Sequence, residues 1–119
     1  DAWEIVQQAD DPDSTIILDA FHNWNSHSTL EALKAIPLEK ISHYHIDDAA
    51  PGKPATTQTD PDRVMLGEGQ IDLAAEIEVL KAKGYDKTVS LELFNAELWK
   101  QDPLEVITTG LTRMKALFT

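Results

Sequence analysis

The chain has 119 residues, of which 42% are apolar, with five glycines, six prolines and no cysteine. This composition is typical of one folded domain and excludes a disulfide scaffold, a thiolate metal site and a cysteine nucleophile. Ten basic and twenty-one acidic side chains give a net charge of −11. That charge disfavours nucleic acid as a partner, because its phosphates would be repelled.

The sequence carries no signal for membrane insertion or export. Its apolar stretches, such as residues 15–18, are only a few residues long, whereas a helix that crosses a bilayer needs roughly 20. No membrane partner is therefore expected. The chain opens at Asp1 without a basic segment and an apolar segment of a secretory signal, so we expect it to start in mid-protein. The absence of cysteine is compatible with a cytoplasmic location, which we expect.

In the first half of the chain the predicted elements alternate between helix and strand. Apolar residues around Trp3 predict the end of an amphipathic helix, which is closed by the turn at residues 10–13. An apolar strand follows over residues 15–19. Residues 28–31 have the pattern of a capping box that opens a short helix, which a proline stops. Residues 40–46 are predicted as the second strand.

The second half begins with an irregular connection over residues 47–70. A connection of this length inside a compact domain is usually functional or disordered, and we expect a loop that covers a substrate. A helix over residues 72–84, ended by a glycine, and a third strand over residues 88–94 come next. Asp102 and Pro103 are residue types favoured at the N-cap and the first position of a helix, so we expect a helix to begin there. The predicted apolar face of this last helix consists of Leu104, Ile107, Leu111 and Leu117.

Strands that alternate with helices are typical of βα units with a parallel sheet, so the predicted fold class is α/β. Each predicted strand ends, on its carboxyl side, with a residue that can bind a metal: Asp19, His45 and Glu92. In parallel α/β folds ligands bind at that edge of the sheet. Two carboxylates and one imidazole suit Mn²⁺ or Mg²⁺, and Zn²⁺ less specifically.

The candidate ligands also have structural interpretations. Asp19 is equally well explained as the N-cap of the segment that follows it. Glu92 lies between Leu91 and Leu93, where a buried carboxylate needs a charged partner or a metal. His43 shares a face with His45 but lies further from the loop edge, so we assign it to the core.

Two other groups of residues near the predicted metal site each have two interpretations. Asp47 and Asp48 are interpreted as solvated or capping groups, with support of the histidine ring as the lesser alternative. Trp24, Phe94 and Trp99 are interpreted either as an apolar wall over a ligand or as packing under the loops.

Four segments in order resemble the closing strands of the xylose-isomerase-like TIM-barrel superfamily. They are residues 18–22 (LDAFH), 43–47 (HYHID), 62–69 (DRVMLGEG) and 90–94 (SLELF). Within it they are most similar to the sugar (phosphate) isomerase/epimerase branch, which includes ketose 3-epimerases, hydroxypyruvate isomerases and inosose isomerases or dehydratases. The resemblance covers nearly the whole chain. It implies the C-terminal portion, about three βα units, of a (β/α)8 barrel.

The resemblance also implies roles for individual residues. Asp19, His45 and Glu92 would bind a divalent metal, Mn²⁺ or Mg²⁺ in the first place and Zn²⁺ or Co²⁺ as alternatives, and Glu92 would also be the catalytic carboxylate. His22 and Arg63 would hydrogen-bond substrate oxygens. A fourth ligand, a glutamate that serves as the second acid/base, would come from a strand outside this chain.

The implied function is that of a metal-dependent isomerase or epimerase. It would act on a sugar or polyol ketone by proton transfer through a cis-enediolate. The alternative is a keto-cyclitol dehydratase of the inosose type, in which the same enolate loses a β-hydroxyl group. An endonuclease relative would need further metal ligands and a basic groove, and the sequence has neither.

The length of the chain qualifies this function. A complete barrel needs about 250 residues, so residues 1–119 are expected to form a single partial-barrel domain that lacks the N-terminal units. The isolated chain would be a catalytically incomplete fragment, with little or no activity. Because its sheet would have two open edges, we expect it to self-associate or to pair with the missing half of the barrel.

Overall fold

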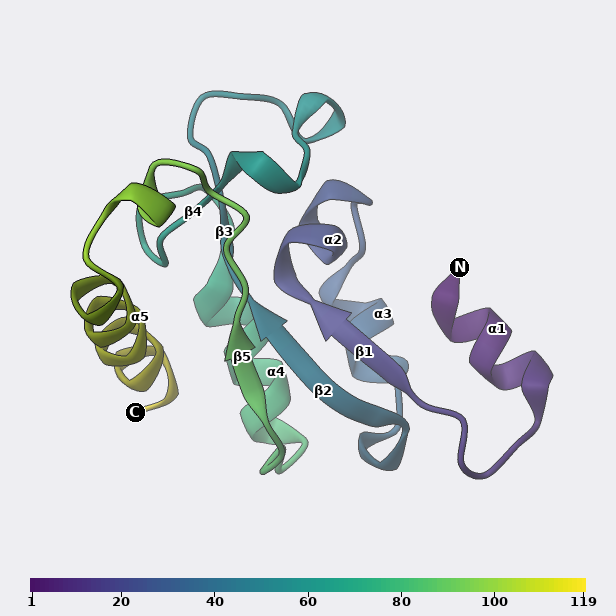
Figure 1. Ribbon diagram of the computed structural model, residues 1–119. Helices are drawn as coiled ribbons and strands as arrows, with labels where there is room; N and C mark the ends of the chain where they lie inside the picture. Colours follow the sequence, from purple (N-terminus) through teal and green to yellow (C-terminus); the bar gives the residue numbers. More distant parts are fainter.

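The computed structural model describes residues 1–119 and has the predicted alternation of strands and helices (Figure 1). The helices are α1 (Ala2–Ala9), α2 (Ala20–Asn25), α3 (Leu30–Ala35), α4 (Leu73–Ala82) and α5 (Pro103–Phe118). The strands are β1 (Ile16–Asp19), β2 (Ile41–Ile46), β3 (Asp48–Ala49), β4 (Arg63–Val64) and β5 (Val89–Leu91). The predicted α/β fold class is confirmed. No helix combines the length and the hydropathy that a bilayer crossing requires.

A parallel three-stranded sheet, in the order β1-β2-β5, organises the chain. In its register Asp19 lies opposite His45, and His45 lies opposite Ser90, so the carboxyl ends of the strands are level. In Figure 1 the helices α3 and α4 lie behind this sheet. The core fills the space between them, where Tyr44 and Ile77 are fully buried. The opposite face of the sheet carries no helix and holds the histidines of β2.

Side-chain caps determine where the helices begin. Asp72 accepts the Ala75 N–H at the start of α4, and Asp102 caps α5 ahead of Pro103, as predicted. The predicted capping box at residues 28–31 is wrong. Thr29, not Ser28, is the N-cap of α3, since its hydroxyl accepts the Ala32 N–H at 3.1 Å. The helix therefore begins one residue later than the pattern indicated.

The strands are shorter than predicted. The third strand ends at Leu91 instead of residue 94, because its partner β2 ends at Ile46 and the next residue leaves the sheet. The last ladder bond runs from the Glu92 N–H to the Ile46 carbonyl at 3.3 Å. Glu92 therefore lies just beyond β5, where its side chain is free to turn toward the neighbouring strand ends.

Residues 47–70 are more regular than predicted. They contain the antiparallel pair β3-β4 and two short 3-10 turns. Asp48 is buried and accepts the N–H groups of Gly67, Gly69 and Ile71, each at 3.0 Å. Asp48 is thus a capping group, but the expectation that it is solvated is wrong, since its carboxylate holds the returning loop together.

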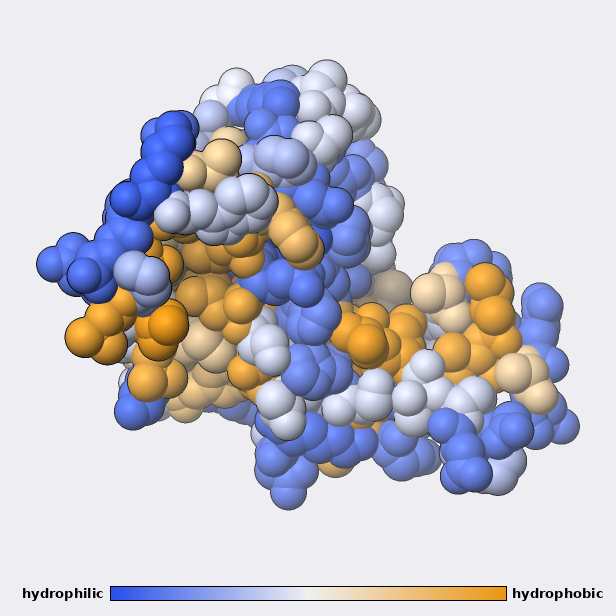
Figure 2. All heavy atoms as spheres, in the orientation of Figure 1, coloured by the Kyte–Doolittle hydropathy of each residue, from blue (hydrophilic) through white to orange (hydrophobic).

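The predicted apolar face of α5 is wrong for three of its four residues. Leu104, Ile107 and Leu111 are 73%, 62% and 48% exposed. The helix instead packs through a neighbouring stripe that includes Gly110, whose backbone lies so close to β5 that an added Cβ would be 2.3 Å from a Leu91 methyl group. The apolar arc of α5 is wider than its contact, and Figure 2 shows apolar side chains gathered over this helix at the left of the molecule.

Both edges of the sheet are open. On the β1 side, a groove of about 620 Å³ separates α1 from β1 and α3, and its lining includes Trp3, Leu33 and Glu76. Figure 1 shows α1 standing apart from the remaining helices. On the β5 side, nothing covers the exposed stripe Leu104, Ile107 and Leu111.

Candidate metal centre

Asp19 has both of the roles considered for it. One carboxylate oxygen, Oδ1, accepts the His22 N–H at 2.9 Å and caps α2. The other, Oδ2, lies 3.7 Å from Nδ1 of His45, the last-but-one residue of β2. The helix cap therefore fixes the carboxylate while leaving one oxygen at the carboxyl edge of the sheet.

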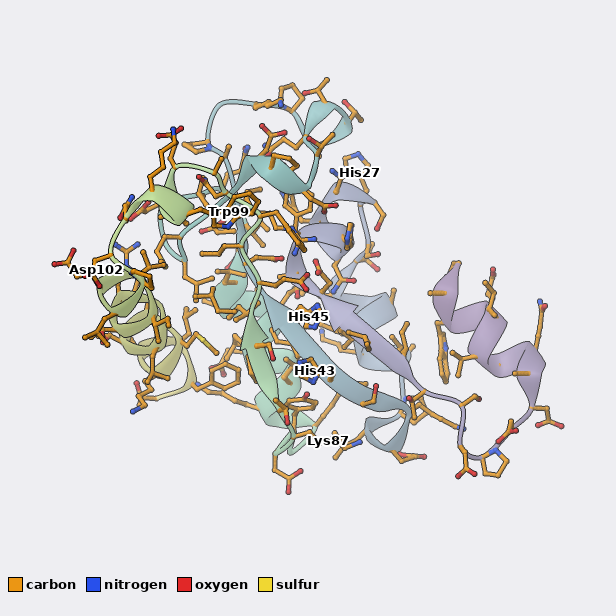
Figure 3. All side chains as sticks on the ribbon, in the orientation of Figure 1. His27, His43, His45, Lys87, Trp99 and Asp102 are labelled. Carbon is orange, nitrogen blue, oxygen red and sulfur yellow. The ribbon has the colours of Figure 1, made fainter.

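His45 is oriented by its neighbours on the open face of β2. Its ring meets the ring of His43 edge-on, with centroids 4.9 Å apart, and Figure 3 shows the two rings one above the other. His43 Nε2 in turn lies 2.8 Å from the Ser90 hydroxyl on β5. This contact satisfies the His43 ring as expected, but His43 is half-buried on the open face and not in the core as predicted. Nδ1 of His45 remains turned toward the carboxylates.

Glu92 completes a cluster of three potential ligands. Its Oε2 lies 3.3 Å from His45 Nδ1, and one ligand atom each of Asp19, His45 and Glu92 all lie within 4.8 Å of one another. Glu92 is 35% exposed rather than buried as predicted, because the sheet face in front of it is open. The structure thus brings together the three residues singled out as metal ligands, each from a different strand end.

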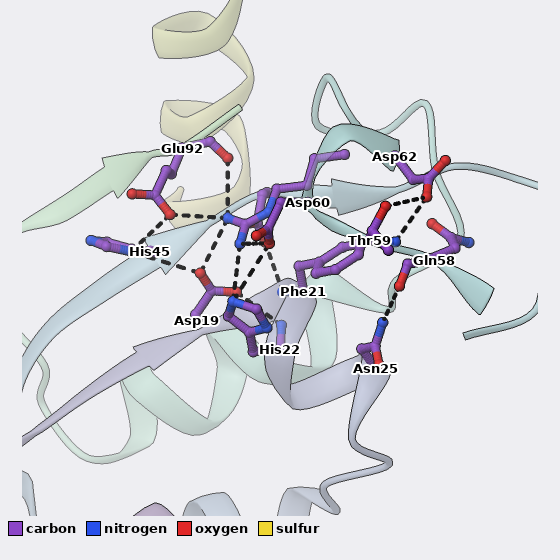
Figure 4. A network of polar contacts seen from close by, with 12 residues as sticks. Asp19, Phe21, His22, Asn25, His45, Gln58, Thr59, Asp60, Asp62 and Glu92 are labelled. Atoms are coloured by element: carbon purple, nitrogen blue, oxygen red, sulfur yellow. Dashed lines mark hydrogen bonds and ion pairs between the residues drawn. The ribbon is translucent and has the colours of Figure 1, made fainter. Parts of the chain in front are cut away.

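Arg63 lies at the centre of this cluster and is 1% exposed. Its guanidinium is stacked between the rings of Phe21 and Phe94, at 5.0 and 5.2 Å from their centroids. Figure 4 shows the network of polar contacts that includes Asp19, Asp60 and Glu92. Nη1 donates to Asp47, to Glu92 Oε2 at 3.0 Å and to Asp19 Oδ2 at 3.2 Å, and Nη2 donates to Asp60 at 2.8 Å and lies 3.2 Å from His22 Nε2. Nε is buried without a partner.

The two residues predicted to contact substrate differ in accessibility. His22, on α2, is 62% exposed and stands at the rim of the site, 3.7 Å from Asp60. Arg63 is enclosed, and both of its terminal nitrogens are already engaged. Phe94 packs against Arg63, while Trp99 is exposed. Of the three aromatic residues weighed as a wall, Phe94 therefore lies at the site.

Asp47 was interpreted as a solvated or capping group; it is fully buried, so the solvated alternative is wrong. Its carboxylate accepts the Phe21 N–H at 2.7 Å and a hydrogen bond from Arg63. Burial, reinforced by Asp19, raises the pKa of Asp47 to about 8, against the opposing effects of Arg63 and the Phe21 N–H. No local signal marks its burial, because its partner Arg63 lies 16 residues further along the chain.

A second buried polar group lies on the helix side of the sheet. Glu76 of α4 accepts a hydrogen bond from the Tyr44 hydroxyl at 2.8 Å, and Asn23 Nδ2 lies 3.5 Å from the same oxygen. Burial raises the pKa of Glu76, although both of these donors oppose the shift. No sequence pattern predicts this cluster, because Tyr44 and Glu76 are 32 residues apart.

The donor set fits a divalent cation. Two carboxylates and one imidazole, turned toward one another, are ligands that Mn²⁺, Mg²⁺ and Zn²⁺ accept. Four carboxyl groups surround the single guanidinium of Arg63. Even when Asp47 is protonated, the other three leave an excess of negative charge at this end of the sheet. A cation would offset that excess, and the separations of 3.3 and 3.7 Å are those of ligands that share one ion.

The sequence profile of the family described as "Xylose isomerase-like TIM barrel" matches residues 1–117. Among curated proteins, the inosose isomerase of Bacillus subtilis (strain 168) is 41% identical over 109 residues, which are 92% of this chain and 39% of that protein. The 3-dehydroshikimate dehydratase of Pseudomonas putida (strain KT2440) is 33% identical over 94 residues, 78% of this chain and 15% of that protein.

Among solved structures, a crystal structure of the IolI protein with a bound zinc atom superimposes with a TM-score of 0.91 and 38% identity. The match covers 98% of this chain and 42% of that chain. The chain therefore spans about two fifths of the length of the isomerase relatives it matches. The parallel sheet and this coverage match part of a TIM barrel.

Proposed function

Because the chain belongs to the xylose isomerase-like TIM barrel family, we propose that it carries metal-binding and catalytic residues of an enzyme for keto-cyclitols of the inosose type. The observation that carries the proposal is the convergence of Asp19, His45 and Glu92 within 4.8 Å. The 41% identity to an inosose isomerase supports a keto-cyclitol within the broader class of sugar or polyol ketones that the resemblance implied.

The side chains divide the chemistry between them. The bound ion supplies Lewis-acid polarisation of a substrate carbonyl, which makes the neighbouring C–H more acidic. Glu92, which is partly exposed at the open face, takes that proton as the general base. His22 stands at the rim, where it hydrogen-bonds a substrate hydroxyl. Arg63 balances negative charge that develops on oxygen. Return of the proton to another carbon completes an isomerisation.

We propose Mn²⁺ or Mg²⁺ as the ion, because two of the three ligands are carboxylates. Zn²⁺ is the alternative, supported by the imidazole ligand and by the zinc atom of the IolI neighbour. Co²⁺ is compatible with the same donors.

Dehydration is the second candidate. The same enolate would lose a β-hydroxyl group instead of being reprotonated, so the residues need not change. Its support is the similarity to two 3-dehydroshikimate dehydratases, 33% and 32% identical over nearly four fifths of this chain. Product analysis separates the two reactions, because dehydration yields one water and an unsaturated ketone.

We propose further that residues 1–119 form one partial-barrel domain, inactive alone, which is completed by additional polypeptide. β1 and β5 each have an unpaired edge, and the exposed stripe on α5 lies beside one of them. Adding parallel strands to these edges would cover both the stripe and the groove at α1. The added part would also bring a fourth ligand and the second acid/base.

The test is a chimera in which the part of the Bacillus subtilis isomerase that precedes the matched region is fused before Asp1. The metal-loaded chimera is incubated with inosose in D₂O, and deuterium uptake next to the carbonyl is followed by NMR. We expect uptake, and a loss of at least about 10³-fold in Glu92→Gln. Glu97→Gln, an exposed glutamate paired with Lys100, is the matched control and should leave the rate unchanged.

A folded, metal-loaded chimera that incorporates no deuterium contradicts the proposal. Equal rates in Glu92→Gln and the unsubstituted chimera would remove Glu92 from its role. Uptake at a similar rate by the 119-residue chain alone would refute the claim that this chain is inactive by itself.

A further inference from the structure

Two consecutive aspartates, Asp47 and Asp48, are both buried but face different parts of the molecule. Asp48 accepts backbone N–H groups of the loop that returns to α4. Asp47 contacts Arg63 and the backbone of α2 instead. The pair therefore offers two carboxylates of the same type and burial, of which only one touches the candidate metal centre.

We propose that Asp47 is a positioning residue of the metal centre, which holds the Arg63 guanidinium so that the ligand oxygens of Asp19 and Glu92 stay available to a cation. The inference rests on the metal site of the proposed function. It assigns a role to a residue that contacts neither the ion nor the substrate.

Three carboxylates compete for the hydrogen bonds of one nitrogen, Nη1 of Arg63. Nη1 of Arg63 has two N–H groups and three carboxylates within reach. Asp47 accepts from this nitrogen, and Glu92 Oε2 and Asp19 Oδ2 lie 3.0 and 3.2 Å from it. Without Asp47, both N–H groups would turn to those two oxygens. They are the same oxygens that face His45, so Arg63 would compete with the ion for them.

Asp47 also fixes the segment that carries a ligand. Its Oδ1 accepts the N–H of Phe21, two residues after Asp19, and Asp19 itself caps the next N–H of the same turn. The ring of Phe21 also covers the guanidinium of Arg63 at 5.0 Å. Asp47 thus connects the start of α2 to Arg63. The side chain of Asp19, which caps this helix, is then held in place and loses less conformational freedom when the ion binds.

The test compares Asp47→Asn with Asp48→Asn in the 119-residue chain. Affinity for Zn²⁺ and Co²⁺ is measured by calorimetry, and the visible absorption spectrum of bound Co²⁺ reports the ligand geometry. Partners of metal ligands change affinity by about 10- to 100-fold when they are substituted. We expect a loss in this range and an altered spectrum for Asp47→Asn. We expect Asp48→Asn to lower the midpoint of unfolding while leaving both metal readouts unchanged.

Asp47→Ser is the second variant, because its hydroxyl can still accept the Phe21 N–H while contact with Arg63 is lost. It should weaken binding as Asp47→Asn does, and it serves if the asparagine variant does not fold. Unchanged affinity and spectrum in a folded Asp47 variant would overturn the proposal. So would an equal loss in Asp48→Asn, since the effect would then belong to any buried carboxylate.

The same titration separates this inference from the proposed function. If the unsubstituted chain binds no ion, or binds it equally after His45→Ala, the metal centre fails and the role of Asp47 fails with it. If the unsubstituted chain binds through His45 and the Asp47 variants bind equally well, only the positioning role is lost.

Discussion

The carboxyl end of the sheet and its two lateral edges differ in how completely their side chains are paired or buried. At the carboxyl end, Arg63 makes hydrogen bonds to four carboxylates and is enclosed by two aromatic rings. At the edges, Ile17 of β1 and Ile107 of α5 are more than half exposed. The three candidate ligands and Arg63 are therefore positioned by contacts within this chain, while the packing at the lateral edges is left open.

This difference follows from the kinds of interaction involved. A buried charge is strongly destabilising unless a partner meets it, so the groups around Arg63 must be supplied together. An apolar side chain at an open edge lacks only the favourable free energy of transfer from water, so single exposed apolar residues are tolerated. Substitutions in the two regions should therefore differ in size.

The largest effect is expected for Arg63→Met. The substitution removes the partner of the fully buried Asp47 and of Asp19, and breaking a buried pair in this way costs about 3–5 kcal/mol of unfolding free energy. Urea denaturation measures it. Lys100→Met, at an exposed ion pair with Glu97, is the matched control and should change stability by about 0.5 kcal/mol or less. A loss below about 1 kcal/mol for Arg63→Met would mean that the site is not held by this pair.

A smaller effect is expected from pH at the groove beside β1. Burial raises the pKa of Glu76, so the folded chain holds a proton there that the unfolded chain releases above the ordinary value of 4.5. By linkage, the contribution of Glu76 to the free energy of unfolding is present at low pH. It falls as the pH rises from the ordinary value of 4.5 through the raised pKa. Glu76→Gln stays neutral and can still accept from Tyr44.

Unfolding midpoints recorded from pH 4 to pH 8 test this. The stability of Glu76→Gln should fall less than that of the unsubstituted chain over the window. Glu78→Gln, an exposed neighbour paired with Lys81, should fall as the unsubstituted chain does. A slope that Glu76→Gln leaves unaltered would show that this carboxyl is not kept neutral by its burial.

The smallest effect is expected on the outer stripe of α5. Ile107→Ala should change stability by about 0.5 kcal/mol or less, because Ile107 is 62% exposed. Ile77→Ala, the same substitution in the buried core, should cost about 2–5 kcal/mol. Thermal unfolding at low protein concentration compares them. Similar losses for both would show that the stripe is already covered in this chain by self-association.

The convergence of the three candidate ligands could be predicted because alternation along a strand and a common sheet edge depend mainly on local sequence. Asp19, His45 and Glu92 each lie at the carboxyl end of a strand, and parallel pairing brings such ends level. Glu92 was placed correctly although its strand is shorter than expected, because the ladder continues to its N–H.

The rest could not be predicted, since it depends on contacts between distant segments. Asp47 is a polar residue after a strand, and such residues are usually solvated. It is buried only because Arg63, 16 residues later, returns to meet it. The packed face of α5 was predicted wrongly for another reason. Periodicity defines the whole apolar arc of the helix, but contact with β5 determines which part of that arc is buried.

The most direct test of the central claim is a crystal structure of the chain grown with Mn²⁺ or Zn²⁺, with the ion located by its anomalous scattering. We expect one ion bound by Asp19 Oδ2, His45 Nδ1 and Glu92 Oε2 at about 2.0–2.3 Å. An ion bound elsewhere, with these three atoms still held by Arg63 and by one another, would contradict it.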